Sequence, residues 1–99
     1  MQIIIDNRNF EWDDNKAKLN KIKHGVSFQV AAKIFSDENR IEIFDAEHSQ
    51  DEDRWQVIGK VDDVLFVVYT ERKNVTRLIS ARKANHYERC EYYDSEEDY

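Results

Sequence analysis

Residues 55–81, WQVIGKVDDVLFVVYTERKNVTRLISA, contain three consecutive strand patterns joined by two short polar connections. The expected strands cover residues 55–59, 64–70 and 75–81, because each segment is rich in β-branched and aromatic residues. Connections this short join neighbouring antiparallel strands, so the three strands should form an antiparallel meander. The middle strand is apolar at the successive positions LFVVY, which is typical of a strand covered on both faces and places it centrally.

A lysine-rich helix is expected upstream, over residues 15–24. Aspartates at its start are N-cap candidates, and Gly25 suits the left-handed position after the last turn. Leu19 and Ile22 supply its apolar i, i+3 pair, and four lysines leave most of its surface basic: Lys16, Lys18, Lys21 and Lys23. The helix ends at His24, where the helix dipole favours a protonated imidazole. Spacing alone leaves two interpretations open, a titratable functional group and a solvated helix cap.

The remaining elements are shorter. Strand patterns cover residues 3–5, 10–12 and 41–44. A second helix should begin at Ser27, with an apolar stripe at helical spacing formed by Phe28, Ala31, Ile34 and Phe35. Asn85 is expected to cap a last helix that ends at Tyr93, and the acidic tail, residues 94–99, is expected to fray.

Composition indicates one small domain. The chain has 99 residues, and its 40% hydrophobic and 12% aromatic content excludes a disordered chain despite 36% charged residues. The lone Cys90 cannot form an internal disulfide, and no signal peptide or membrane-spanning run is evident, so a cytoplasmic protein is expected.

The net charge of −6 is unevenly distributed. Residues 88–99 hold six acidic side chains against Arg89, and so carry −5 of it. Acidic residues also dominate residues 37–53, whereas basic residues cluster in the last strands: Arg72, Lys73, Arg77, Arg82 and Lys83. We therefore expect a basic face and an acidic face.

The basic residues suggest a first kind of chemistry. RNA cleavage without metal needs a base for the 2′-hydroxyl, an acid for the leaving oxygen and cations for the developing phosphate charge. Strict alternation along residues 75–81 would place Arg77 and Arg82 on opposite faces, so they need not share a site. The alternative is that these arginines are solvated strand residues or partners of the acidic loop.

Two other constellations are weaker. The loop contains Asp45, Glu47, His48, Asp51, Glu52 and Asp53, but no recognised metal-ligand spacing, so no metal is predicted. Facing a basic partner or capping Arg54 is the favoured role of this loop. The C-terminal tyrosines could stack on bases, yet their acidic neighbours repel phosphate, so packing or protein contact is favoured: Tyr87, Tyr92, Tyr93 and Tyr99.

A series of motifs over residues 10–93 resembles the BrnT-type ribonuclease toxins. The first half contributes Phe10-Glu11-Trp12-Asp13, Lys16, Lys23-His24-Gly25-Val26-Ser27-Phe28, Ala31 and Phe35. The second half contributes Asp45, His48-Ser49, Glu52, Arg54, Ile58-Gly59, Val68-Tyr69-Thr70-Glu71-Arg72, Arg77, Ile79-Ser80-Ala81-Arg82-Lys83-Ala84, Glu88-Arg89 and Tyr92. Residues 1–9 and the tail depart from the family pattern. The combination of the motifs over residues 10–93 is far more specific than any single motif.

The resemblance implies a RelE-like α+β fold, an antiparallel sheet flanked by helices, over a single toxin domain of residues 1–99. It also implies an RNA endonuclease toxin of a type II toxin–antitoxin system, without cofactor. A ribbon-helix-helix antitoxin would neutralise it in a 2:2 heterotetramer and supply the DNA contacts, as suits a weakly acidic toxin.

By matching position, the implied site residues are Lys23, His24, Glu71, Arg72, Arg77 and Arg82. His24 or Glu71 would be the base, and the arginines would clamp phosphate. The alternative is a non-catalytic antitoxin-binding protein that acts in transcriptional autoregulation.

Overall fold

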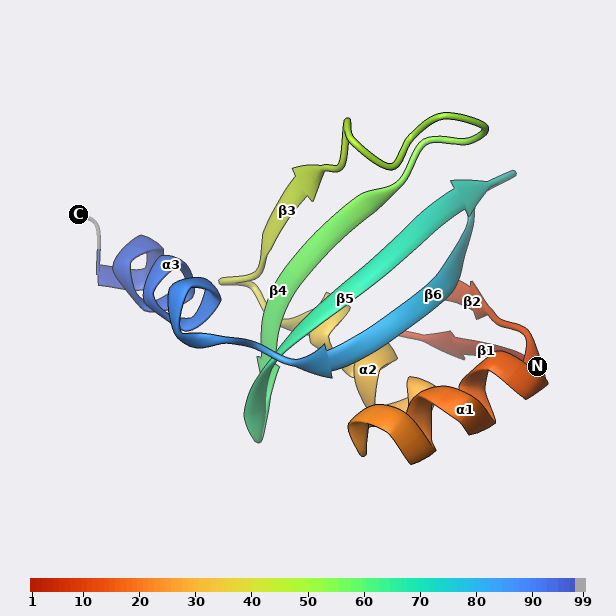
Figure 1. Cartoon of the computed structure of the whole chain (residues 1–99), viewed down its shortest axis with the longest axis horizontal. Helices are drawn as coiled ribbons and strands as arrows, with labels where there is room; N and C mark the ends of the chain where they lie inside the picture. Colours follow the sequence, from red (N-terminus) through yellow and green to blue (C-terminus); the bar gives the residue numbers. More distant parts are fainter. Residues whose placement is uncertain (98–99) are drawn as a thin grey trace.

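The computed structural model describes residues 1–97, which form a six-stranded sheet with helices packed against it (Figure 1). The strands are β1 (Gln2–Ile5), β2 (Arg8–Glu11), β3 (Ile41–Phe44), β4 (Trp55–Val61), β5 (Asp63–Arg72) and β6 (Val75–Lys83). The helices are α1 (Asp14–His24), α2 (Phe28–Ala32), the 3₁₀ turn η1 (Lys33–Ser36) and α3 (His86–Glu97). Within this described part of the chain, every helix is too short or too polar to cross a membrane.

The strand order is β1-β2-β6-β5-β4-β3. Strands β4, β5 and β6 form the expected antiparallel meander, with β5 inside the sheet. However, β2 pairs with β6 in parallel, so the sheet is mixed and the expectation of a wholly antiparallel sheet is wrong at this pair. Parallel strands need a long crossover connection, and residues 12–74, which lie between β2 and β6, supply it.

The main core lies between the sheet and the two N-terminal helices (Figure 1). The expected stripe of α2 and η1 is buried there against β5 and β6. Gly59 of β4 permits this packing, since a Cβ atom there would lie 3.0 Å from the Cβ of Ile34. A smaller cluster under α3, which includes Ile58, Val64 and Tyr92, covers one end of the opposite face.

Helix α1 has the expected ends but not the expected buried face. The Asp13 carboxylate accepts a hydrogen bond from the Lys16 amide at 2.9 Å, and Gly25 ends the helix with φ +73°. The expected apolar pair points to solvent, with Leu19 65% and Ile22 77% exposed, whereas Asn20 is buried.

Asn20 is buried because it completes the edge of β6. Strand β2 pairs only with the first residues of β6, as far as Arg77. Further along, the Asn20 amide donates to the Ala81 carbonyl at 2.8 Å, and its oxygen accepts from the Ala81 N–H at 3.1 Å. The side chain thus replaces a missing strand at this point.

A β-bulge in β6 changes which side chains share a face. Val68 lies opposite Ser80 and Tyr69 lies opposite Leu78, so Ile79 is the extra residue. The bulge reverses the alternation beyond it. Leu78 and Ala81 therefore both face the main core.

Arg77 and Arg82 consequently share the other side of the sheet, which we call the open face. The register places Arg77 opposite Thr70 and Arg82 opposite Phe66, two residues of the same face of β5. The expectation that these arginines lie on opposite faces is therefore wrong, because strict alternation takes no account of a bulge.

Helix α3 begins as expected and ends later. Asn85 and Glu88 cap it reciprocally: the Glu88 amide donates to the Asn85 side chain at 2.9 Å, and the Asn85 amide donates to the Glu88 carboxylate at 2.8 Å. The helix continues past Tyr93 to Glu97, since no glycine or proline stops it. The last two residues of the expected tail, 98–99, lie outside the described residues.

Candidate active site

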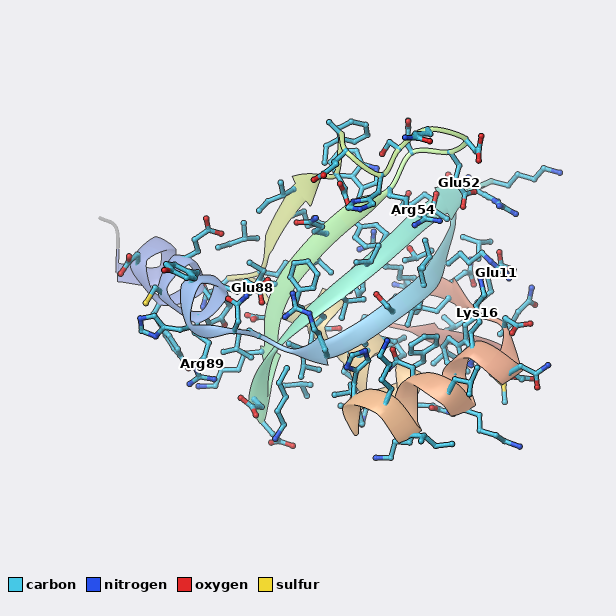
Figure 2. The ribbon with its side chains drawn as sticks, in the orientation of Figure 1. Glu11, Lys16, Glu52, Arg54, Glu88 and Arg89 are labelled. Carbon is cyan, nitrogen blue, oxygen red and sulfur yellow. The ribbon has the colours of Figure 1, made fainter. Side chains whose placement is uncertain are left out.

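Three of the arginines predicted from the sequence face the open side of β5 and β6. Arg72 lies on this face of β5, and Arg77 and Arg82 lie on it in β6. The face is bounded by α3 at one end and by residues 45–54 at the other. Figure 2 shows Glu52 and Arg54 near the C-terminal end of β5, whereas Glu88 lies on α3 toward the other end of the sheet. The open face is therefore lined by cations and by carboxylates.

Arg72 is held by the acidic loop. Its guanidinium donates to the Glu52 carboxylate at 2.5 and 3.2 Å. This hydrogen bond, followed by the charges of Arg72, Arg54 and Arg77, outweighs desolvation and holds the pKa of Glu52 below its ordinary value. The alternative that loop acids pair with strand arginines therefore holds for Arg72, and Arg54 and Arg77 add positive charge near Glu52.

Arg82 is tied to α3. Its guanidinium lies 4.2 Å from the centre of the Phe66 ring and makes a bidentate pair with Glu88 at 2.8 and 2.9 Å. Burial raises the pKa of Glu88, but the hydrogen bonds from Arg82 and Asn85 and the charge of Arg82 outweigh it, so the pKa is lowered. Arg82 thus has a structural role, whereas among residues 1–97 Arg77 makes only a long ion pair, with Glu11 at 3.5 Å.

Glu71 lies on the opposite, helix-covered face. It is opposite Thr76 in β6, and its carboxylate accepts a hydrogen bond from Arg8 at 2.7 Å. It lines a separate cavity of about 320 Å³ with Tyr69, whose hydroxyl donates to Glu42 at 2.6 Å. Burial, followed by this hydrogen bond to Glu42, raises the pKa of the Tyr69 hydroxyl. Glu71 is not brought together with the three arginines.

Lys23 and His24 occupy the last turn of α1. Lys23 is exposed and His24 is half-buried. Helix α1 contacts β6 through Asn20 from the helix-covered side, so its last turn lies beside the edge of β6 rather than over the open face (Figure 1). The structure therefore places Arg72, Arg77 and Arg82 on one face of the sheet, whereas Lys23 and His24 lie on α1 and Glu71 lies on the helix-covered face.

The loop of residues 45–54 contributes an aspartate–histidine pair that was not among the predicted site residues. Asp45 is 8% exposed, and its two carboxylate oxygens lie 3.1 and 3.0 Å from His48 Nδ1. The carboxylate also accepts from the His48 amide at 3.2 Å. Burial raises the pKa of Asp45, but hydrogen bonds from Gln56 and His48 outweigh it and keep the pKa low. The carboxylate thus stays charged and orients the imidazole.

The same loop is tied down at its base. The Asp45 amide donates to the Arg54 carbonyl at 2.8 Å, and the Arg54 amide donates to the Ser49 hydroxyl oxygen at 2.8 Å. A cavity of about 530 Å³ opens beside it, lined by Glu47, His48, Gln50, Asp51, Glu52, Arg54 and Arg72. Within residues 1–97, no three His, Cys, Asp or Glu side chains are grouped so that they could hold a metal ion. The sequence signal for the Asp45–His48 pair is an aspartate three residues before a histidine in a polar loop.

The fold and this site define a small α+β protein with a group of arginines on an exposed sheet face. Residues 12–88 match the family model described as "Ribonuclease toxin, BrnT, of type II toxin-antitoxin system". The chain belongs to this family of ribonuclease toxins, as its motifs predicted. The family, the α+β fold and the ribonuclease class are thereby confirmed. A toxin of this kind implies an antitoxin partner.

The fold is similar to that of a solved relative. The crystal structure of the Brucella abortus ribonuclease toxin BrnT superposes with a TM-score of 0.62 at 22% sequence identity. The match covers 78% of this chain and 96% of that one. No curated protein matches the chain.

Proposed function

We propose that this chain is a metal-independent RNA endonuclease that binds the RNA backbone on its open face and thereby stops translation and growth. The observation that carries the proposal is the β-bulge at Ile79, because it brings Arg77 and Arg82 to the same face as Arg72. A group of guanidinium ions suits a phosphodiester whose charge grows in the transition state.

The carboxylates beside these arginines are compatible with phosphate binding. Each guanidinium has five N–H donors, and a carboxylate partner occupies only some of them. Glu52 and Glu88 therefore hold Arg72 and Arg82 in place while leaving donors for a phosphate. The site residues proposed from the sequence remain Lys23, His24, Glu71, Arg72, Arg77 and Arg82, and the geometry supports the arginines most directly.

The proposed partner is a ribbon-helix-helix antitoxin in a 2:2 heterotetramer in the cytoplasm, with DNA bound only through the antitoxin. The solvent-facing side of α1 supports a protein contact, since Leu19 and Ile22 are exposed there among lysines. Leu19 and Ile22, with lysines around them, suit a partner segment that is apolar and carries carboxylates.

Cleavage by the purified chain tests the activity. We expect it to cut single-stranded RNA at an unchanged rate in EDTA, because acid–base groups and arginines suffice for this chemistry. Induction of the chain alone should arrest growth with loss of RNA, and the adjacent antitoxin should reverse the arrest. Activity that EDTA abolishes and Mg²⁺ restores would contradict metal independence. Normal growth with folded chain present, and no cleavage, would favour the non-catalytic antitoxin-binding protein.

A further inference from the structure

His48 lines the cavity beside the loop of residues 45–54, and its ring is oriented by Asp45. Its Nδ1 lies 3.0 Å from the buried Asp45 carboxylate, which favours the tautomer with the proton on Nδ1 and leaves Nε2 free to accept a proton. The His48 side chain is 60% exposed, so the ring reaches solvent although its inner edge is fixed. An oriented imidazole beside a carboxylate is the usual arrangement of a general base.

The groups around His48 define what would bind there. Arg54 and Arg72 line the same cavity and supply positive charge for a phosphate. Glu47, Asp51 and Glu52 also line it, and Glu52 is already paired with Arg72 at 2.5 Å. The exposed acids disfavour a long stretch of RNA backbone in the loop itself. The cavity therefore suits one phosphodiester held between the loop and the C-terminal end of β5.

We infer that His48, oriented by Asp45, is the general base of this ribonuclease, and that Arg54 and Arg72 hold the phosphodiester it cleaves. The inference rests on the proposed RNA endonuclease function and names its catalytic residue. It differs from the assignment of the base to His24 or Glu71, because His48 lines one cavity with Arg54 and Arg72, whereas Glu71 lies on the helix-covered face and His24 on α1.

The reaction is a transesterification. His48 Nε2 takes the proton of the ribose 2′-hydroxyl, and the 2′-oxygen forms a bond to phosphorus. The bond between phosphorus and the 5′-oxygen breaks, and the 5′-oxygen takes a proton from water. The products are a 2′,3′-cyclic phosphate and a 5′-hydroxyl, and the imidazolium returns its proton to solvent. Asp45 is a positioning residue, since its carboxylate contacts His48 and Gln56 and does not line the cavity.

The three histidines of the chain make a matched test. The variants His48→Asn, His24→Asn and His86→Asn would be purified as full chains and compared on one 5′-labelled single-stranded RNA at fixed enzyme excess. We expect His48→Asn to lower the cleavage rate by about 100-fold or more, the range for loss of a general base. His86→Asn, which changes an exposed histidine on α3, should stay close to the wild-type rate, and His24→Asn tests the base proposed from the sequence.

Further measurements separate catalysis from folding. The melting temperature of His48→Asn should equal that of the wild type, because the replaced ring is mostly exposed. Asp45→Asn should also lose activity, and a 2′-deoxy nucleotide at the cut position should block cleavage.

The outcomes are distinguishable. If the wild type cleaves RNA and His48→Asn cleaves at the same rate, the inference is wrong and the proposed function stands. Loss of activity in His24→Asn alone would return the base to α1. If the wild type cleaves no RNA, the proposed function itself is wrong.

Discussion

Single side chains in this protein often have roles that their residue type does not suggest. Asn20 is buried while its neighbours Leu19 and Ile22 are exposed, since the amide satisfies both backbone groups of Ala81. At the same scale, Asp45 uses its carboxylate to orient one imidazole. Hydrogen-bond geometry, and not hydrophobicity, decides the place of these residues.

The burial of Asn20 leads to a prediction in which a buried amide is replaced by an apolar side chain. Asn20→Leu adds apolar surface to the core but leaves the buried Ala81 N–H and carbonyl without these partners. We expect the free energy of unfolding to fall by about 2 kcal/mol or more, measured by urea denaturation. The reverse substitution at the exposed neighbour, Leu19→Asn, should change it by less than about 0.5 kcal/mol. Equal stabilities would mean that the amide adds nothing.

At the scale of elements, the end of β6 and the start of α3 form one unit. Arg82 stacks on Phe66 and forms an ion pair with Glu88, and Glu88 also caps the helix in which it lies. The same arginine thus positions α3 at the border of the open face. Arg77, two residues before the bulge, has no comparable attachment beyond its 3.5 Å pair with Glu11.

This difference predicts opposite behaviour for two arginine variants. Arg82→Ala should cost about 1.5–3 kcal/mol of stability, the range for hydrogen bonds to a charged group, and should loosen α3. Arg77→Ala should cost less than about 1 kcal/mol, as expected for a surface pair, and yet lower RNA cleavage.

Thermal melting and cleavage rates of both variants test this directly. The double variant Arg82→Ala with Glu88→Ala serves as the control, since it should lose less stability than the sum of the two single variants if the two side chains act together. An Arg82→Ala protein that melts like the wild type would show that the pair contributes nothing to folding.

Over the whole molecule, hydrogen-bonded carboxylates connect the helices and loops to the sheet. Asp37 accepts hydrogen bonds from the Tyr92 hydroxyl at 2.6 Å and from the Lys60 amide at 2.8 Å, and so connects η1, α3 and β4. Burial raises its pKa, but these hydrogen bonds outweigh it and lower the pKa. The pKa values of Glu52 and Glu88 are lowered as well.

These lowered values predict an acid-sensitive fold. A carboxylate whose folded pKa lies below its unfolded value stabilises the protein fully above the unfolded value, about 4, and this stabilisation is lost as pH falls through the folded value. We expect the melting temperature to change little between pH 7 and 5 and to drop below pH 4. Asp37→Asn should reduce that drop, whereas the same change of charge at exposed Glu38, Glu38→Gln, should leave it. A melting temperature that is constant down to pH 3 would contradict the prediction.

The sequence by itself determined the elements that depend on local patterns. The meander followed from three β-branched strands with short connections, and the ends of α1 followed from Asp13 and Gly25, because caps and turns are decided by a few neighbouring residues. The motif series over residues 10–93 also gave the family, which the match over residues 12–88 confirmed.

Tertiary structure alone decided the parallel pairing of β2 with β6, the burial of Asn20 and the bulge at Ile79. Each depends on which segments distant in sequence meet, and local periodicity carries no such information. The geometry of the candidate site also depends on which distant segments meet. The arginines could be named from their motif, but whether they share a face was decided by one extra residue in a strand, since a shift of one position moves every later side chain to the other side of the sheet.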